Sequence, residues 1–228
     1  MFQEVNSIMT SFKDIETVIK KVEKYIKRFE DPSVTQISNT RKDPYDVLIS
    51  CILSLRTRDV TTLEASKRLF KLANTPEKML RLSDKNVEEA IYPVGFYKTK
   101  TRNIRKINKI LLEKYSGKVP EKFDDLLELH GVGRKTANIV MVYGFEKEGL
   151  PIDVHCHRIP NRLGWIQTKT PDQTEDVLRK ILPKRLWSSF NNTFVTFGQN
   201  VCKPIGPKCF LCPVEKYCKY ESKSLERR

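Results

Sequence analysis

The chain has 228 residues, and its 42 Lys and Arg outnumber 28 Asp and Glu to give a formal net charge of +14. This charge favours a polyanionic partner but leaves nucleic acid, an anionic membrane and an acidic protein open. The longest apolar stretch, Val47 to Leu55, is far shorter than the roughly 20 residues that span a bilayer, which argues against a membrane protein. Residues 1–16 carry acids where a secretory signal needs positive charge, so we expect an intracellular protein of the cytoplasm or nucleoid.

Helical periodicity recurs along the chain, beginning with apolar residues at helical spacing from Phe12 to Phe29. Asp31-Pro32 is expected to stop this first helix. Further helices, separated by breakers, are predicted over residues 44–55, 59–72, 76–82, 84–92, 99–115, 121–129, 135–143, 154–163, 172–181 and 184–199. Strand-like alternation between tight turns is scarce, so the predicted fold class is all-α.

A tight Gly-Val-Gly turn joins two of these helices in the segment LLELHGVGRKTA, residues 126–137. The two glycines permit backbone angles and close approaches that a side chain would forbid. Backbone amides at the turn and at the start of the next helix can then bind a phosphate without reading base sequence. The pattern indicates a DNA-binding helix-hairpin-helix, and an ordinary helical hairpin is the alternative.

Four cysteines lie close together near the carboxyl end, in the segment CKPIGPKCFLCPVEKYC. They are Cys202, Cys209, Cys212 and Cys218. Four thiolates at this spacing can enclose one tetrahedral metal ion or one iron–sulfur cubane. Zinc ribbons usually present two short C-x-x-C pairs, whereas this segment has one such pair and two wider gaps. The spacing therefore favours a [4Fe-4S] cluster over zinc. Cys51, in an apolar run, is expected to be a core residue.

Taken in order, these motifs resemble the signature of the endonuclease III family of base-excision repair enzymes. The resemblance is carried by LHGVGRKTANIV, by the following loop EKEGLPIDVHCHRIPNRLG and by the cysteine cluster. It extends upstream through DPYDVLISCILSLRTRDV and VGFYKTKTRNI, and so covers the chain from about residue 40 to residue 218.

The resemblance implies two helical domains with a DNA-binding cleft between them. One would be a six-helix barrel, residues 38–146, that ends in the hairpin. The other would combine residues 1–37 with residues 147–228 and hold the [4Fe-4S] cluster. The resemblance also places the family's lysine nucleophile at Lys135 and its essential aspartate at Asp153. The implied activity is excision of damaged bases, oxidised pyrimidines in particular, followed by cleavage of the abasic site, by a monomer acting on double-stranded DNA.

The same resemblance suggests which residues contact DNA. In the hairpin these are Gly131, Val132, Gly133, Arg134 and Thr136. Arg56, Val94 and Phe96 match residues that fill the gap left by an extruded base, and ordinary core packing is the alternative for Val94 and Phe96. Lys98 and Lys100 follow in a basic segment suited to phosphates.

Two departures from the commoner family pattern bear on function. His130 stands where the family often has proline, and Arg56 stands where bacterial relatives usually carry glutamine, which puts the choice of lesion and opposite base in doubt. A monofunctional mismatch glycosylase, which makes no Schiff base, is one alternative. A non-catalytic DNA-binding module that uses the hairpin and a metal staple is another.

Overall fold

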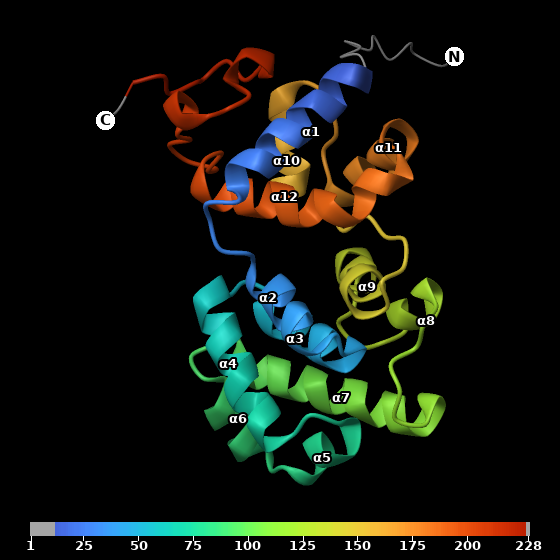
Figure 1. Ribbon diagram of the computed structural model, residues 1–228. Coiled ribbons are helices and arrows are strands. Elements are labelled where there is room, and N and C mark those ends of the chain that lie inside the picture. Colours follow the sequence, from blue (N-terminus) through green and yellow to red (C-terminus); the bar gives the residue numbers. More distant parts are fainter. Residues whose placement is uncertain (1–11, 227–228) are drawn as a thin grey trace. The chain divides into compact units, whose positions relative to one another are not determined.

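The computed structural model describes residues 12–226, and its side chains from residue 14 onwards. The described residues form two compact units: residues 12–30 together with residues 152–226, and residues 31–151 (Figure 1). The described residues form helices and no strand, which confirms the predicted all-α class.

The unit of residues 31–151 is built around α3 (Pro44–Ser54), whose residues from Tyr45 to Leu53 are all buried. A helix that is buried all round needs neighbours on every side. Here α2, α4, α7 and α9 all pack against it. Asp43 caps its start by accepting a hydrogen bond from the Tyr45 amide at 2.9 Å, and Pro44 occupies the first helical position. The remaining helices of this unit are α2 (Ser33–Arg41), α4 (Asp59–Leu72), α5 (Pro76–Arg81), α6 (Asp84–Ile91), α7 (Tyr97–Tyr115), α8 (Phe123–Leu127) and α9 (Arg134–Ile139), which continues as a π-helical turn, η1 (Val140–Gly144).

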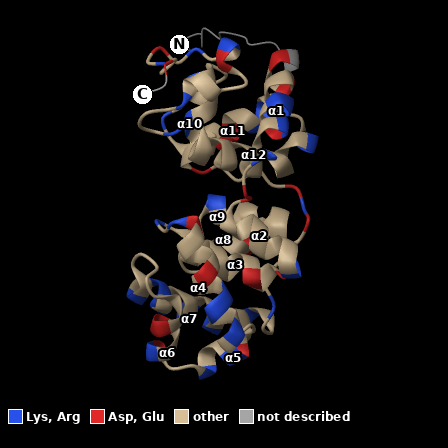
Figure 2. Ribbon diagram, turned by 60° about the vertical axis from the view of Figure 1, so that its left-hand side comes forward, with Lys and Arg blue, Asp and Glu red and all other residues tan. Residues whose placement is uncertain are grey.

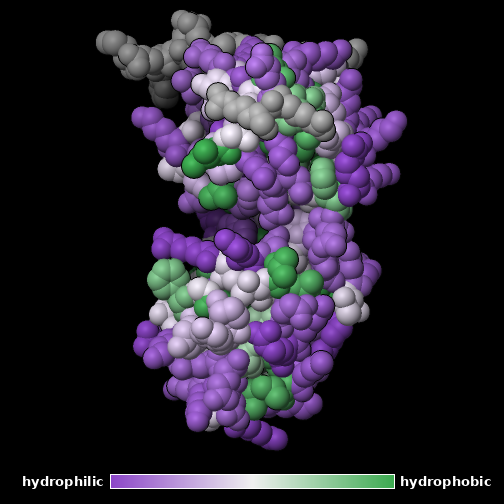
Figure 3. Space-filling model, turned by 90° about the vertical axis from the view of Figure 1, so that its left-hand side faces the viewer, coloured by the Kyte–Doolittle hydropathy of each residue, from purple (hydrophilic) through white to green (hydrophobic). Residues whose placement is uncertain are grey.

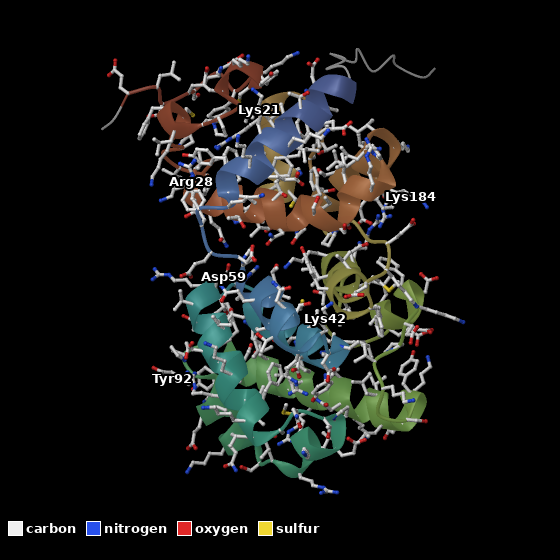
Figure 4. All side chains as sticks on the ribbon, in the orientation of Figure 1. Lys21, Arg28, Lys42, Asp59, Tyr92 and Lys184 are labelled. Carbon is white, nitrogen blue, oxygen red and sulfur yellow. The ribbon has the colours of Figure 1, made fainter. Side chains whose placement is uncertain are left out.

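Helix α2 was not among the predicted elements, because its sequence SVTQISNTR has no apolar stripe. Contacts from other elements hold it in place. The Ser33 hydroxyl donates to Asp59 in the first turn of α4 at 2.9 Å, and the Ser38 hydroxyl donates to the Tyr143 carbonyl at 2.7 Å (Figure 4 labels Asp59). The division expected at residue 38 falls inside this helix, whereas the compact unit begins at residue 31.

The other unit packs α1 (Phe12–Ile26), α10 (Val154–Leu163) and α11 (Pro171–Ile181) with α12 (Trp187–Asn200), which follows a 3-10 turn, η2 (Lys184–Leu186). Helix α12 contacts both α1 and α10 and supplies the buried rings of Phe190, Phe194 and Phe197. Between α12 and residue 226, the last one described, the chain has only two short 3-10 turns, η3 (Cys209–Leu211) and η4 (Glu215–Tyr217). This carboxyl segment carries the four clustered cysteines.

The surface is dominated by polar and basic side chains. Lys and Arg are distributed over the helices of both units (Figure 2), and the face in Figure 3 is largely hydrophilic with small apolar patches. Among residues 12–226, no helix has the length and the apolar character needed to cross a membrane.

Candidate active site and DNA-contact residues

Lys135 is the second residue of α9 and follows the hairpin turn directly. It is half-buried, and α9 packs against α3, the central helix of its unit. Burial raises the pKa of the Cys51 thiol on α3 to about 12, and the charge of Lys135 acts in the opposite direction on that thiol. Lys135 therefore lies beside the core of its unit rather than among the freely solvated lysines of the surface.

The hairpin turn between α8 and α9 has one residue buried in the core, Val132, and two exposed glycines, Gly131 and Gly133. Val132 is 7% exposed and belongs to the core, while the left-handed backbone of Gly131, with φ +78°, reverses the chain. Gly133 is exposed, and a methyl group placed on it would meet no described atom within 4 Å. The fold itself therefore does not require glycine at position 133. The Thr136 side chain is buried, so this residue can offer a ligand only its backbone amide, whereas Arg134 is half-buried.

Asp153 is the N-cap of α10. Its Oδ1 accepts hydrogen bonds from the amides of His155 and Cys156, both at 2.8 Å. These two bonds fix the orientation of the half-buried carboxyl group, and Oδ2 takes no part in the cap. A carboxylate held in this way is favoured by the positive end of the helix dipole.

Arg56 and Phe96 lie together on two neighbouring loops, one between α3 and α4 and one before α7. Both side chains are exposed, Phe96 by 65%, and both residues have left-handed backbones with φ of 53° and 56°. The Arg56 guanidinium lies 5.9 Å from the centre of the Phe96 ring. A methyl group on Gly95 would lie 2.9 Å from the Arg56 carbonyl oxygen, so the loops meet backbone to backbone. Tyr92, on the same segment as Phe96, is also exposed (Figure 4).

Two predicted DNA contacts have to be corrected. Val94 is 1% exposed and packs in the hydrophobic core of residues 31–151, so its side chain cannot enter a duplex without leaving that core. Lys100 is 4% exposed, and its ammonium group donates to the carbonyls of Leu53 and Leu55 and to the Thr57 hydroxyl. Lys100 therefore has no donor left for a phosphate.

The four clustered cysteines line one cavity together with Arg162, Tyr220 and Lys223. All four are free thiols, and burial raises the pKa of Cys212 to about 12, with the other three cysteines adding to the rise. Burial also raises the pKa of Cys218. In residues 12–226 no three His, Cys, Asp or Glu side chains converge closely enough to hold a single metal ion. The four predicted cysteines thus line the same cavity, but their sulfur atoms are not close enough together to bind a single metal ion.

Comparison with known proteins identifies the family. Residues 49–184, which include both Lys135 and Asp153, match the model of the HhH-GPD superfamily of base excision DNA repair proteins. Endonuclease III of Thermotoga maritima is 47% identical over 178 residues, which cover 78% of this chain and 84% of that protein.

The chain belongs to the endonuclease III family.

Other endonuclease III proteins extend this relationship. Endonuclease III-like protein 1 of Mus musculus is 39% identical over 76% of this chain, although the match covers 59% of the mouse protein. A solved covalent intermediate of endonuclease III trapped with DNA superposes with a TM-score of 0.82 at 31% identity, covering 92% of this chain and 97% of that one. A non-covalent endonuclease III–DNA complex gives 0.83 at the same identity and covers 96% of its own chain.

Sequence reasoning missed the arginines that support the cysteine segment of this endonuclease III family member. Arg162 donates to the Lys203 and Pro204 carbonyls at 2.7 and 2.9 Å and approaches the Cys202 sulfur at 3.5 Å. Arg158, one helical turn earlier, donates to the Cys202 carbonyl at 2.7 Å. Their i, i+4 spacing on α10 is visible in the sequence and puts both on one helical face, but the sequence alone does not show what that face meets.

Proposed function

We propose that the chain is a bifunctional DNA glycosylase and abasic-site lyase that removes damaged bases, with Lys135 as nucleophile and Asp153 as its carboxylate partner. Membership of the endonuclease III family makes it a base-excision DNA glycosylase with lyase activity. The residue roles rest on the positions of these two side chains in the fold. Within the matched family region, Lys135 is held at the core edge directly after the hairpin, and Asp153 is fixed by the first amides of α10.

The chemistry requires a neutral amine and a stabilised cation. The Lys135 amine attacks C1′ of the damaged nucleotide, and the C1′–N bond breaks so that the base leaves with the bonding electrons. Opening of the sugar ring gives a protonated imine, which acidifies the C2′ hydrogen. Loss of that proton forms a C2′–C3′ double bond and expels the 3′ phosphate, which nicks the strand. Asp153 stabilises the cationic sugar or accepts a proton from the lysine.

The proposed partner is damaged double-stranded DNA bound by a monomer inside the cell. Open space at Gly133 supports close approach of a phosphate to the hairpin backbone. Arg56 and Phe96, exposed side by side, are suited to fill the gap left by an extruded base. The proposed lesions are damaged bases, oxidised pyrimidines in particular, as the family resemblance implies, and a damaged base costs less to extrude from the duplex than an intact paired one.

A [4Fe-4S] cluster bound by Cys202, Cys209, Cys212 and Cys218 completes the proposal. The donor set fits, because four free thiols line one cavity and the Arg162 guanidinium approaches one of the sulfurs. Such a cluster, when bound, supplies a covalent staple for a segment that has little helix of its own. The charge of Lys223, which lines the same cavity, opposes the rise that burial causes in the pKa of Cys218.

Borohydride trapping tests the catalytic assignment. The wild-type protein is expected to form a covalent adduct with a duplex that contains an abasic site or an oxidised pyrimidine, and Lys135→Ala is expected to lose it by a factor of about 1,000 or more. Lys122→Ala, which removes an exposed amine next to α8, is the matched control and should trap normally. Release of the base by the wild-type protein without any adduct would instead indicate a monofunctional glycosylase.

A further inference from the structure

Lys100 is an unusual lysine because its ammonium group is buried and all of its hydrogen-bond partners are uncharged. It lies on α7 and is 4% exposed. Its Nζ donates to the Leu53 carbonyl at 2.7 Å, to the Leu55 carbonyl at 2.6 Å and to the Thr57 hydroxyl at 2.9 Å. An ammonium group has three donors, so this geometry uses all of them.

The three acceptors belong to the end of α3 and to the loop that carries Arg56. Helix α3 ends at Ser54, and its last carbonyls have no intrahelical partner. A cation at this position is favoured by the negative end of the helix dipole. The Leu55 and Thr57 contacts flank Arg56, whose left-handed backbone, with φ 53°, needs support from its surroundings. Lys100 thus fixes the loop on both sides of Arg56.

A second contact connects this loop to Phe96. The Thr57 hydroxyl that receives the Lys100 hydrogen bond also accepts one from the Gly95 amide at 3.3 Å. Gly95 directly precedes Phe96, and Phe96 directly precedes α7, the helix on which Lys100 lies one turn later. Thr57 therefore lies at the junction of both loops, and Lys100 holds it there.

We infer that Lys100 is a positioning residue that locks the Arg56 loop against the Phe96 loop, so that the two exposed side chains enter DNA as one preformed wedge. This inference rests on the proposed function, which assigns Arg56 and Phe96 to the gap left by the extruded base. A preformed wedge lowers the loss of conformational entropy on insertion, because neither loop has to become ordered when it contacts DNA.

The test measures insertion separately from chemistry. A duplex carries 2-aminopurine opposite a tetrahydrofuran abasic analogue, and the rise in its fluorescence on saturation with the full-length protein reports unstacking of the orphan base. Phe96→Ala defines the signal without the wedge. Lys100→Met is expected to reduce the rise about fivefold to tenfold, as the loss of one or two hydrogen bonds would produce. Lys106→Met, which removes an exposed lysine of the same helix, should match the wild type.

Thr57→Val provides a second variant in case Lys100→Met fails to fold. It retains the shape of the side chain but removes the acceptor shared by Lys100 and Gly95, so the same loss of fluorescence is expected. The double variant Lys100→Met with Phe96→Ala should be no worse than Phe96→Ala alone, since both changes remove one function.

Three results would count against the inference. If Lys100→Met and Thr57→Val keep the wild-type rise while Phe96→Ala loses it, the positioning role is wrong and the proposed function stands. If the losses in the double variant multiply, Lys100 acts somewhere other than on the wedge. If Phe96→Ala keeps the wild-type rise, the wedge itself is wrong, and borohydride trapping through Lys135 then shows separately whether the proposed chemistry survives.

Discussion

The burial of Lys100 follows from its position on α7. A lysine in a basic segment suggests a phosphate contact. However, Lys100 shares a helical face with Ile104, Ile107 and Leu111, at spacings of four, three and four residues, and all of these side chains are buried. The sequence therefore contained the signal for burial. It could not show the acceptors, because they come from the end of α3 and the loop after it, 43 to 47 residues before Lys100.

Asp46 gives a prediction about pH at the same scale. Its carboxyl group is 2% exposed, with the Arg41 guanidinium at 3.2 Å. Burial raises the pKa of Asp46 to about 6, against the opposing charge of Arg41. A raised pKa means that the folded state binds this proton more tightly than the unfolded chain. The protonated Asp46 carboxyl group therefore stabilises the folded state below about pH 4, and this contribution to the free energy of unfolding is lost as pH rises through about 6.

Asp46→Asn should therefore gain stability relative to the wild type as pH rises. The difference in unfolding free energy between the two proteins is expected to shift in favour of the variant by on the order of 2 kcal/mol between pH 4 and pH 7. Urea denaturation at both values measures it. Asp124→Asn, at an exposed carboxyl group, is the control and should show no such shift. A constant difference for Asp46→Asn would mean that this carboxyl group is not buried in solution.

At the scale of elements, the sequence predicts the helices that have apolar periodicity and clear boundary residues. It does not predict a helix that is stabilised mainly by contacts with distant segments. The ranges 59–72 and 154–163 coincide with α4 and α10, because apolar periodicity and a Gly or polar boundary mark both. Helix α2 has no apolar stripe and depends on hydrogen bonds from Ser33 and Ser38 to distant segments. The predicted helix over residues 135–143 changes to a π turn at Val140, which periodicity does not reveal.

The hairpin yields a prediction that separates folding from DNA binding. Gly131→Ala forces a side chain into a backbone with φ +78° and should cost about 1 kcal/mol or more of stability. Gly133→Ala places its methyl group in open space, so its stability should match the wild type within about 0.5 kcal/mol. Only a ligand close to the backbone would meet that methyl group. Fluorescence anisotropy with an abasic duplex should therefore show weaker binding by Gly133→Ala, and unchanged binding would argue against phosphate contact at this turn.

At the scale of the whole molecule, the proposed cluster should support one segment and not the helical units. Residues 202–218 contain only two 3-10 turns, and of their apolar side chains only Pro207 and Val214 are buried. Replacing Cys209 and Cys212 with serine should remove iron and sulfide from the protein and expose the amides of this segment to rapid hydrogen exchange. The amides of α3 and α7 should remain protected. Cys51→Ala, a core cysteine in the other unit, is the control and should retain the metal content and the brown colour of the wild type. Zinc in place of iron would refute the cofactor assignment.

The net charge of +14 predicts binding to DNA that weakens steeply with salt, and individual lysines should contribute according to their exposure. Each phosphate neutralised adds roughly −0.9 to the slope of log Kobs against log salt concentration. Lys98→Ala removes an exposed cation near the wedge and should make the slope shallower by about 1. Lys100→Met removes the same formal charge two residues away but should leave the slope unchanged, because its buried ammonium group contacts only protein atoms.

Titrations at several salt concentrations measure both slopes. Equal changes for the two lysines would mean that total charge rather than contact sets the affinity for DNA, and that the ammonium group of Lys100 is accessible to DNA in solution.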